Sequence, residues 1–142
     1  LKLKIWGSRW DACTPILKKY LMHGVVTGDL YSTAIQSSTI NIALLSEKVK
    51  GATAGDKITS RTFHIPANNA FMLHQASTEI SSYFDIGEEV DCFGDKDDLV
   101  KKVSYYLENS KLREKVKTAG YNRCIEHHSI LHRAQMIMQH LK

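Results

Sequence analysis

One stretch of the sequence predicts the centre of the fold: Asp56-Lys57-Ile58-Thr59-Ser60-Arg61-Thr62-Phe63-His64-Ile65-Pro66-Ala67-Asn68-Asn69-Ala70-Phe71-Met72-Leu73-His74. Thr59 or Ser60 can cap a helix by accepting a hydrogen bond from one of its first N–H groups. Pro66 removes one hydrogen bond inside that helix, so we expect the helix to be short or kinked. The apolar run Ala70–Leu73 is typical of a parallel strand that is covered on both faces. We therefore expect a loop, a short helix and a buried strand.

The start of this helix is a candidate anion site. Ser60, Arg61 and Thr62 would combine free N–H groups, the positive end of the helix dipole and a guanidinium. A phosphate is the first ligand that such a set predicts. The alternative is an ordinary capped helix with a surface arginine, and these residues alone leave both interpretations open.

Strands and helices are expected to alternate on both sides of this stretch. Apolar or β-branched runs predict strands at Leu1–Trp6, Val25–Thr27, Thr39–Leu45, Ala70–Leu73 and Val90–Phe93. Helical spacing and capping residues predict helices that follow Pro15, span Leu30–Ser37 and Ser77–Phe84, and begin after Asp95, Ser110 and Ser129. The polar segment Glu47–Asp56 is expected to be a loop with a functional role.

The three helices at the end of the chain each carry an apolar stripe. The stripes consist of Leu99, Val103, Tyr106 and Leu107, then Leu112, Val116 and Ala119, then Ile130, Ala134, Ile137, Met138 and Leu141. We expect the first two stripes to be buried. The alternation as a whole predicts a single α/β domain over residues 1–142: a Rossmann-like three-layer αβα parallel sheet with C-terminal helices. Ligands of such sheets bind at the carboxyl ends of the strands.

Composition excludes several classes of protein. The formal charge of +4 is mild and no basic face or motif concentrates it, so we expect no nucleic-acid partner. No apolar run approaches the length of a transmembrane segment. Cys13, Cys92 and Cys124 are odd in number and widely spaced, which fits a reducing, cytoplasmic location better than a disulfide framework. The chain opens on Leu1 rather than Met, and from this we expect a fragment of a longer protein.

Several ordered segments resemble the CgeB-like (spore-maturation protein) glycosyltransferases, which belong to the wider GT-B glycosyltransferases. Thr59–Ala67 is similar to the arginine-x-phenylalanine-glutamate segment of that family. The other similar segments are Lys4–Trp10, Phe84–Val90, Leu107–Asn109 with Arg113-Glu114, Ala119-Gly120, and Glu126–Ser129 with His132–Ala134. Together they span nearly the whole chain.

The resemblance implies a fold, an activity and a ligand. It implies the C-terminal half of a GT-B fold, which binds a nucleotide-diphosphate sugar, while a missing N-terminal domain of the same protein binds the acceptor. Transfer in such enzymes needs no obligatory metal and no cofactor, because positive side chains and a helix N-terminus stabilise the leaving diphosphate. The residues implied to bind the nucleotide-sugar are Gly7, Ser8, Arg9, Gly28, Thr59, Ser60, Arg61, Thr62 and His64, with Arg61 in the catalytic role.

Two departures from the family pattern leave alternatives open. His64 stands where the family has a glutamate that is expected to bind the ribose, and imidazole lacks the two oxygens of a carboxylate. Asn69 replaces a glycine, although asparagine tolerates a left-handed backbone after a helix. The alternatives to a sugar transferase are a degenerate, non-catalytic GT-B-like interaction module and a GT-B-shaped sugar epimerase.

Other candidate sites are weaker. His128 and His132 lie four residues apart, but no carboxylate or cysteine accompanies them, so surface or capping roles are favoured over zinc. Cys92 lies in an apolar strand and is expected to be a core residue rather than a nucleophile. Ser8 lacks the G-x-S-x-G context of a serine hydrolase.

Overall fold

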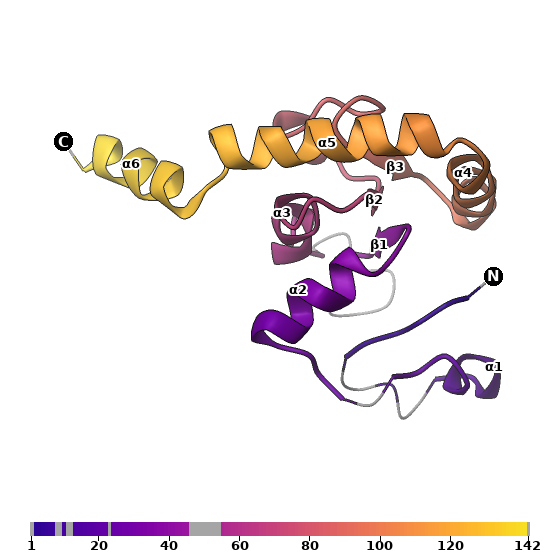
Figure 1. The fold of residues 1–142 in the computed structure, drawn as a ribbon. Coiled ribbons are helices and arrows are strands. Elements are labelled where there is room, and N and C mark those ends of the chain that lie inside the picture. Colours follow the sequence, from indigo (N-terminus) through magenta and orange to yellow (C-terminus); the bar gives the residue numbers. More distant parts are fainter. Residues whose placement is uncertain (1, 8–9, 11–12, 23, 46–54, 142) are drawn as a thin grey trace. The chain divides into compact units, whose positions relative to one another are not determined.

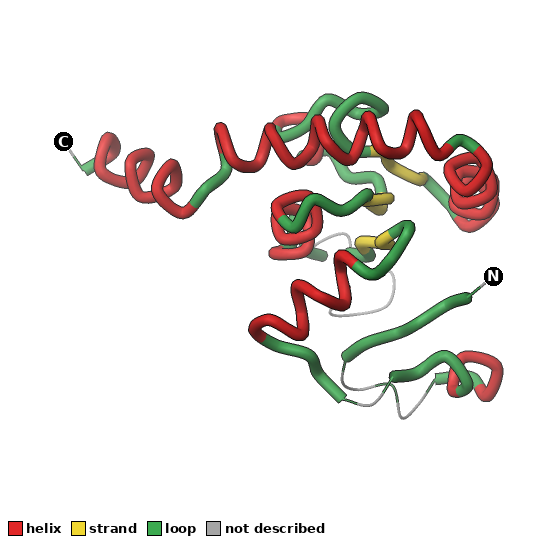
Figure 2. Tube along the Cα trace, viewed as in Figure 1, coloured by secondary structure: helices red, strands yellow, loops and turns green. Residues whose placement is uncertain are grey.

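The computed structural model describes residues 2–7, 10, 13–22, 24–45 and 55–141 (Figures 1 and 2). Backbone contacts divide the chain into two compact units, Leu1–Ala34 and Ile35–Lys142. Most of the loop expected at Glu47–Asp56 falls outside the described residues. The single domain expected over residues 1–142 stays a prediction.

From β1 (Asn41–Ala43) onward the helices and strands follow the expected alternation, although the helix expected at Ser77–Phe84 is reduced to a 3₁₀ turn at Ile80–Ser82. Their bounds are α1 Pro15–Lys18, α2 Gly28–Gln36, β1 Asn41–Ala43, α3 Ser60–Ala67, β2 Met72–Gln75, the 3₁₀ helix η1 Ile80–Ser82, β3 Asp91–Phe93, α4 Lys96–Glu108, α5 Ser110–His127 and α6 Ile130–His140.

The second unit is built on a parallel sheet in the order β1-β2-β3. Asn41 pairs with Met72, and Leu73 pairs with Asp91. Helix α3 packs against β1, β2 and α5, while α4 packs against β3 and α5. The predicted Rossmann-like α/β fold with a parallel sheet is thus confirmed.

The first unit differs from the prediction. Among the described residues 2–6 of the expected strand Leu1–Trp6, only Ile5 pairs, in an isolated parallel bridge with Leu21. The strand expected at Val25–Thr27 does not form. Helix α1 ends at Lys18, one turn earlier than its apolar spacing suggests. Leu21 therefore lies outside the helix and pairs with Ile5, in place of the expected strand Val25–Thr27.

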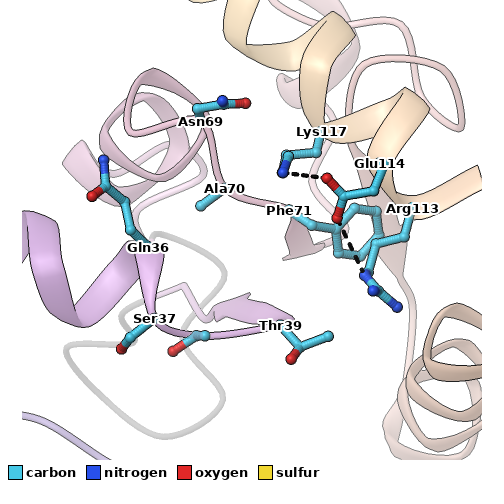
Figure 3. A pocket seen from close by; sticks show the side chains of 10 residues that line it. Gln36, Ser37, Thr39, Asn69, Ala70, Phe71, Arg113, Glu114 and Lys117 are labelled. Atoms are coloured by element: carbon cyan, nitrogen blue, oxygen red, sulfur yellow. Dashed lines mark ion pairs between the residues drawn. The ribbon is translucent and has the colours of Figure 1, made fainter. Parts of the chain in front are cut away.

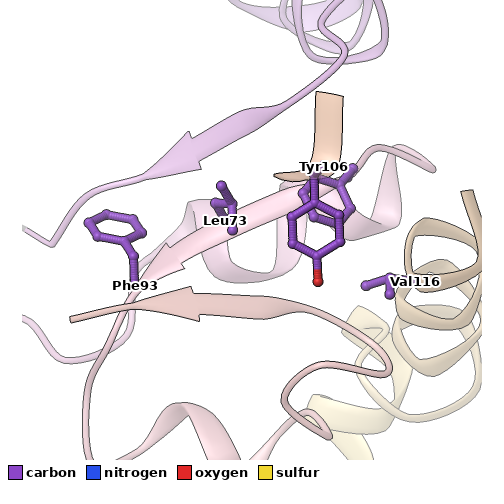
Figure 4. Packing of buried hydrophobic residues seen from close by; sticks show 5 residues of the cluster. Leu73, Phe93, Tyr106 and Val116 are labelled. Carbon is purple, nitrogen blue, oxygen red and sulfur yellow. The ribbon is translucent and has the colours of Figure 1, made fainter. Parts of the chain in front are cut away.

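The core of the second unit lies between the sheet and the helices α4 and α5. Its buried residues are Phe71, Leu73, Phe93, Tyr106 and Val116 (Figure 4). Leu99, Val103 and Leu112 pack against them, which confirms most of the two predicted stripes. The predicted burial of Leu107 is wrong. Its side chain is 43% exposed, because it lies about 100° around the helix from the buried Tyr106.

A buried carboxylate joins β3 to α4. One Asp91 oxygen accepts hydrogen bonds from Lys102 Nζ at 2.8 Å and from the Cys92 N–H, while the other accepts from the Tyr106 hydroxyl at 3.0 Å. Asp91 is therefore paired and hydrogen-bonded, as a buried charge must be. Burial, followed by the charge of Asp91, raises the pKa of the Cys92 thiol to about 11, so this cysteine stays protonated near neutral pH.

The helix ends confirm two of the three predicted caps. Asp95 accepts from the N–H groups of Asp97 and Asp98, and Ser129 accepts from the N–H of His132. Ser110 is the first residue of α5 rather than its cap, because Asn109 both ends α4 and precedes α5.

The apolar stripe of α6 is not buried. The helix forms where the sequence predicts it, but it contains no buried residue, and Figure 1 shows it extending beyond the end of α5. Ile130 is 88% exposed and Ile137 is 63% exposed.

Candidate functional site

Helix α3 starts at the carboxyl edge of the parallel sheet. The guanidinium of Arg61 donates to the carbonyl of Leu44, just after β1, at 2.6 Å. Thr62, one residue further along α3, contacts His74 near the end of β2. The strand ends and the helix start therefore meet at the edge where parallel α/β sheets bind ligands.

The first turn of α3 is held by Thr59 and Thr62, which face each other as in a capping box. The Thr62 hydroxyl accepts from the Thr59 N–H at 3.1 Å, and the Thr62 N–H donates to the Thr59 carbonyl at 3.0 Å. Thr59 is the residue directly before α3, as predicted, but the predicted side-chain cap is not seen. Its hydroxyl oxygen is buried without a hydrogen-bond partner among the described residues. The N–H groups of Ser60 and Arg61 have no acceptor within the helix, as at any helix start.

Within the part of the chain that the structure describes, the guanidinium of Arg61 has one hydrogen-bond acceptor, the Leu44 carbonyl. A guanidinium has five N–H donors in a planar fork, and the Leu44 carbonyl takes one of them. The bond keeps the positive charge beside the positive end of α3. Because both repel cations and attract anions, the local field favours a phosphate or carboxylate.

His74 is fully buried beneath this helix start. Its Nδ1 lies 2.5 Å from the Gln75 carbonyl oxygen, and its Nε2 lies 2.9 Å from the Thr62 hydroxyl. A carbonyl can only accept, so neutral His74 carries its proton on Nδ1, and Nε2 accepts from Thr62. Burial lowers the pKa of His74 below its ordinary value of 6.5, and the charge of Arg61 lowers it further against the raising effect of the Gln75 carbonyl. The ring is therefore neutral near pH 7.

Gln75 fixes the chain that leaves β1. Its side-chain oxygen accepts from the N–H of Leu45 at 3.0 Å. Leu44 and Leu45 are thus tied to α3 and to β2 by neighbouring hydrogen bonds. His74 and Gln75 were not among the predicted site residues. The signal for them was present, because they are the first polar side chains after the apolar run that ends at Leu73.

The predicted site residues have different surroundings. Gly7 and Gly28 lie in the first unit with positive φ angles of 132° and 56°, a backbone region that favours glycine. Ser8 and Arg9 lie outside the described residues. His64 is exposed on α3.

The structure does not support the predicted ligand contact of the Thr62 side chain. It is fully buried, and its hydroxyl is used by Thr59 and His74, so its side chain does not face a ligand as the sequence suggested. The reason is that the third residue of the helix points toward the sheet, whereas the first two lie at the exposed end.

A pocket lies at the opposite, amino edge of the sheet (Figure 3). It has a volume of about 200 Å³ and is lined by Gln36, Ser37, Ser38, Thr39, Asn69, Ala70, Phe71, Arg113, Glu114 and Lys117. Glu114 forms ion pairs with both Arg113 and Lys117, so the cations here are already neutralised in part. Asn69 has a φ of 50°, which confirms its predicted tolerance of the left-handed backbone.

The histidines near α6 make structural contacts. His128 Nε2 lies 2.9 Å from the Tyr83 carbonyl, and its ring packs against Phe63, while His132 Nδ1 lies 2.7 Å from the Ser129 hydroxyl. Within the described ranges, no three His, Cys, Asp or Glu side chains come together in a way that could hold a metal ion. Nor does this part of the chain contain a helix with the length and apolar character needed to cross a membrane.

Comparison with known proteins adds the family. The family described as glycosyl transferase-like matches residues 1–139. No match was found among the curated proteins. The family match covers both compact units, including the sheet edge and the start of α3. The chain belongs to the glycosyl transferase-like family.

Proposed function

We propose that the start of α3 binds the diphosphate of a nucleotide-sugar donor, and that the chain is the donor-binding, C-terminal half of a GT-B glycosyltransferase of the CgeB-like type. The observation that carries this proposal is the position of Arg61, in the first turn of a helix at the carboxyl edge of a parallel sheet. The family match supports a glycosyltransferase-type activity.

The proposed chemistry is transfer of the sugar to an acceptor with loss of the nucleoside diphosphate. The bond from the anomeric carbon to the diphosphate oxygen breaks, and negative charge develops on the leaving diphosphate. The acceptor hydroxyl oxygen forms the new bond and releases its proton to the leaving diphosphate or to solvent. The N–H groups of Ser60 and Arg61 and the guanidinium of Arg61 would stabilise that charge in place, since fixed donors are most effective where charge develops. No metal or cofactor is part of this proposal, and an N-terminal domain of the same cytoplasmic protein would supply the acceptor site.

The test is a titration of the chain with UDP, GDP, ADP and dTDP, followed by calorimetry and by backbone NMR shifts. We expect saturable shifts at Ser60 and Arg61 for at least one of the four. Arg61→Ala should weaken that binding by about tenfold to a hundredfold, because hydrogen bonds to charged groups are worth about 1.5–3 kcal/mol. Lys101→Ala is the control, since it removes the same charge from an exposed position on α4.

Two results would contradict the proposal. One is the absence of saturable shifts at Ser60 and Arg61 with all four diphosphates. The other is an equal loss of affinity in Arg61→Ala and Lys101→Ala, because a general effect of net charge would then explain the binding.

A further inference from the structure

We infer that His74 is a positioning residue for the donor site, acting through the Thr62 hydroxyl to hold the first turn of α3 in the orientation that binds a diphosphate. This inference rests on the proposed function of α3, but its structural part can be tested without any ligand. His74 itself does not reach the ligand edge, because it is fully buried.

The hydrogen bonds of His74 and Thr62 have a fixed direction. The Gln75 carbonyl fixes the proton of neutral His74 on Nδ1, so Nε2 is an acceptor. The Thr62 hydroxyl must then donate to Nε2, and its lone pairs are left for the Thr59 N–H. The three hydrogen bonds form a chain in which each donor has one acceptor. The chain leads from the Thr59 N–H through Thr62 and His74 to the Gln75 carbonyl of β2.

The consequence is a fixed orientation of the helix start. Thr59 and Thr62 flank Ser60 and Arg61, whose N–H groups are the proposed ligand donors. A hydroxyl that could rotate would let this turn fray, as helix ends commonly do. Because His74 accepts from it, the hydroxyl stays aimed at the sheet and the two free N–H groups stay aimed outward.

Burial makes this arrangement strict. Thr62 and His74 are both 0% exposed, so no water replaces a lost partner without a change in packing. A buried donor that loses its acceptor costs about 1–3 kcal/mol, which is enough to favour a different first turn. A residue that only filled space in this position would have no such directional effect.

Two substitutions distinguish the hydrogen bonds made by the two nitrogen atoms of the His74 ring. His74→Gln places a side-chain oxygen where Nε2 accepts from Thr62, whereas His74→Asn reaches only the position of Nδ1 and keeps the bond to the Gln75 carbonyl. Both remove the ring, so they share any loss that comes from packing alone. The pair therefore isolates the hydrogen bond to Thr62.

The experiment measures both variants and the unchanged chain by amide hydrogen exchange without ligand, and by titration with inorganic pyrophosphate and the four nucleoside diphosphates. We expect the Thr59 N–H to be protected in the unchanged chain and in His74→Gln, and to lose at least about tenfold of its protection in His74→Asn. Affinity should fall by about tenfold in His74→Asn and be rescued to within about threefold in His74→Gln. Imidazole ¹⁵N shifts of the unchanged chain should show the proton on Nδ1.

The outcomes separate this inference from the proposed function. If no diphosphate binds the unchanged chain, the proposed function fails, and equal Thr59 protection in the two variants would then overturn the positioning role as well. If a diphosphate binds, equal affinity in His74→Asn and His74→Gln overturns the inference alone. Should His74→Asn fail to fold, Thr62→Val removes the same hydrogen bond from the other side and Thr62→Ser restores it, with the same two readouts.

Discussion

The two faces of α3 are held in different ways. Toward the sheet, Thr62 is bound to His74 by a buried, directional hydrogen bond. Toward α5, Phe63 and Pro66 are packed: Gly120 lies against Pro66, and the Cys124 thiol lies 3.7 Å from the Phe63 carbonyl. Close packing fixes where the helix lies, because interiors leave little free volume. Hydrogen bonds fix how its first turn is oriented, so substitutions on the two faces should affect stability and binding differently.

The largest effect is expected from Gly120→Ala, next to the packed face, where α5 also approaches the backbone of Glu89. A Cβ at this position would lie 2.2 Å from the Glu89 carbonyl oxygen, so α5 would have to move away from the backbone beneath it. We expect a loss of about 3 kcal/mol in the free energy of unfolding, measured by urea denaturation. In Gly94→Ala, the new Cβ meets no atom within 4 Å, and the change should stay within about 0.5 kcal/mol. Similar losses of unfolding free energy in the two variants would disprove the close approach of α5 to the Glu89 backbone.

The hydrogen-bonded face is tested by Thr62→Val and Thr62→Ser. Valine keeps the shape but leaves the Thr59 N–H and His74 Nε2 without their partner, so we expect it to destabilise by about 2 kcal/mol. Serine keeps the hydroxyl and loses only a methyl group, at about 1 kcal/mol. Urea denaturation of both variants measures which of them loses more free energy of unfolding. If valine proved as stable as serine, packing rather than hydrogen bonding would hold this face too.

A pH dependence should follow from the neutral state of the buried histidines. Burial lowers the pKa of both His74 and His128 below the ordinary value of 6.5. As pH falls through 6.5, the unfolded chain binds protons before the folded chain does, so unfolding becomes easier. The contribution to stability is complete above pH 6.5 and is lost as pH falls from there toward the folded pKa values. Denaturation at about pH 7.5, about pH 6.5 and about pH 5.5 measures this loss.

The control for this pH effect is His74→Gln, which has no group that titrates in the range. Its loss of stability on acidification should be shallower than that of the unchanged chain, while the lowered pKa of His128 still contributes to the loss. An unchanged slope in the variant would show that His74 does not take part.

The two faces also differ in how far the sequence predicted them. The helix start after Thr59, the short helix with Pro66 and the buried strand after it follow from local rules of capping, backbone geometry and apolar runs. The His74 hydrogen bond joins residues that are 12 positions apart and depends on side-chain direction, which no local pattern encodes. The sequence made no prediction for the burial of the α6 stripe, because helical spacing indicates a stripe and not what covers it.

The Rossmann-like sheet was predicted because apolar runs and helices alternate strongly in the second unit. In the first unit the runs are short, and tertiary pairing decided between competing extended segments: Leu21 pairs with Ile5, and Val25 does not. The position of Arg61 in the first turn of a helix followed from residue types, and its role in binding a ligand stays a prediction. The burial of Thr62 needed the three-dimensional arrangement.

The smallest effect is expected where the packed face ends, at Arg133 on α6. Its guanidinium lies 4.9 Å from the centre of the Phe63 ring and 5.4 Å from that of Tyr83. Arg133→Ala should lower the free energy of unfolding by about 1 kcal/mol, because a cation over an aromatic ring at a partly exposed position contributes about that much. Ile137→Gln, one turn further along the same helix, should change it by less than about 0.5 kcal/mol, since this side chain is 63% exposed. A larger loss in Ile137→Gln than in Arg133→Ala would mean that the α6 stripe is covered in solution and that the packing around Phe63 does not end at Arg133.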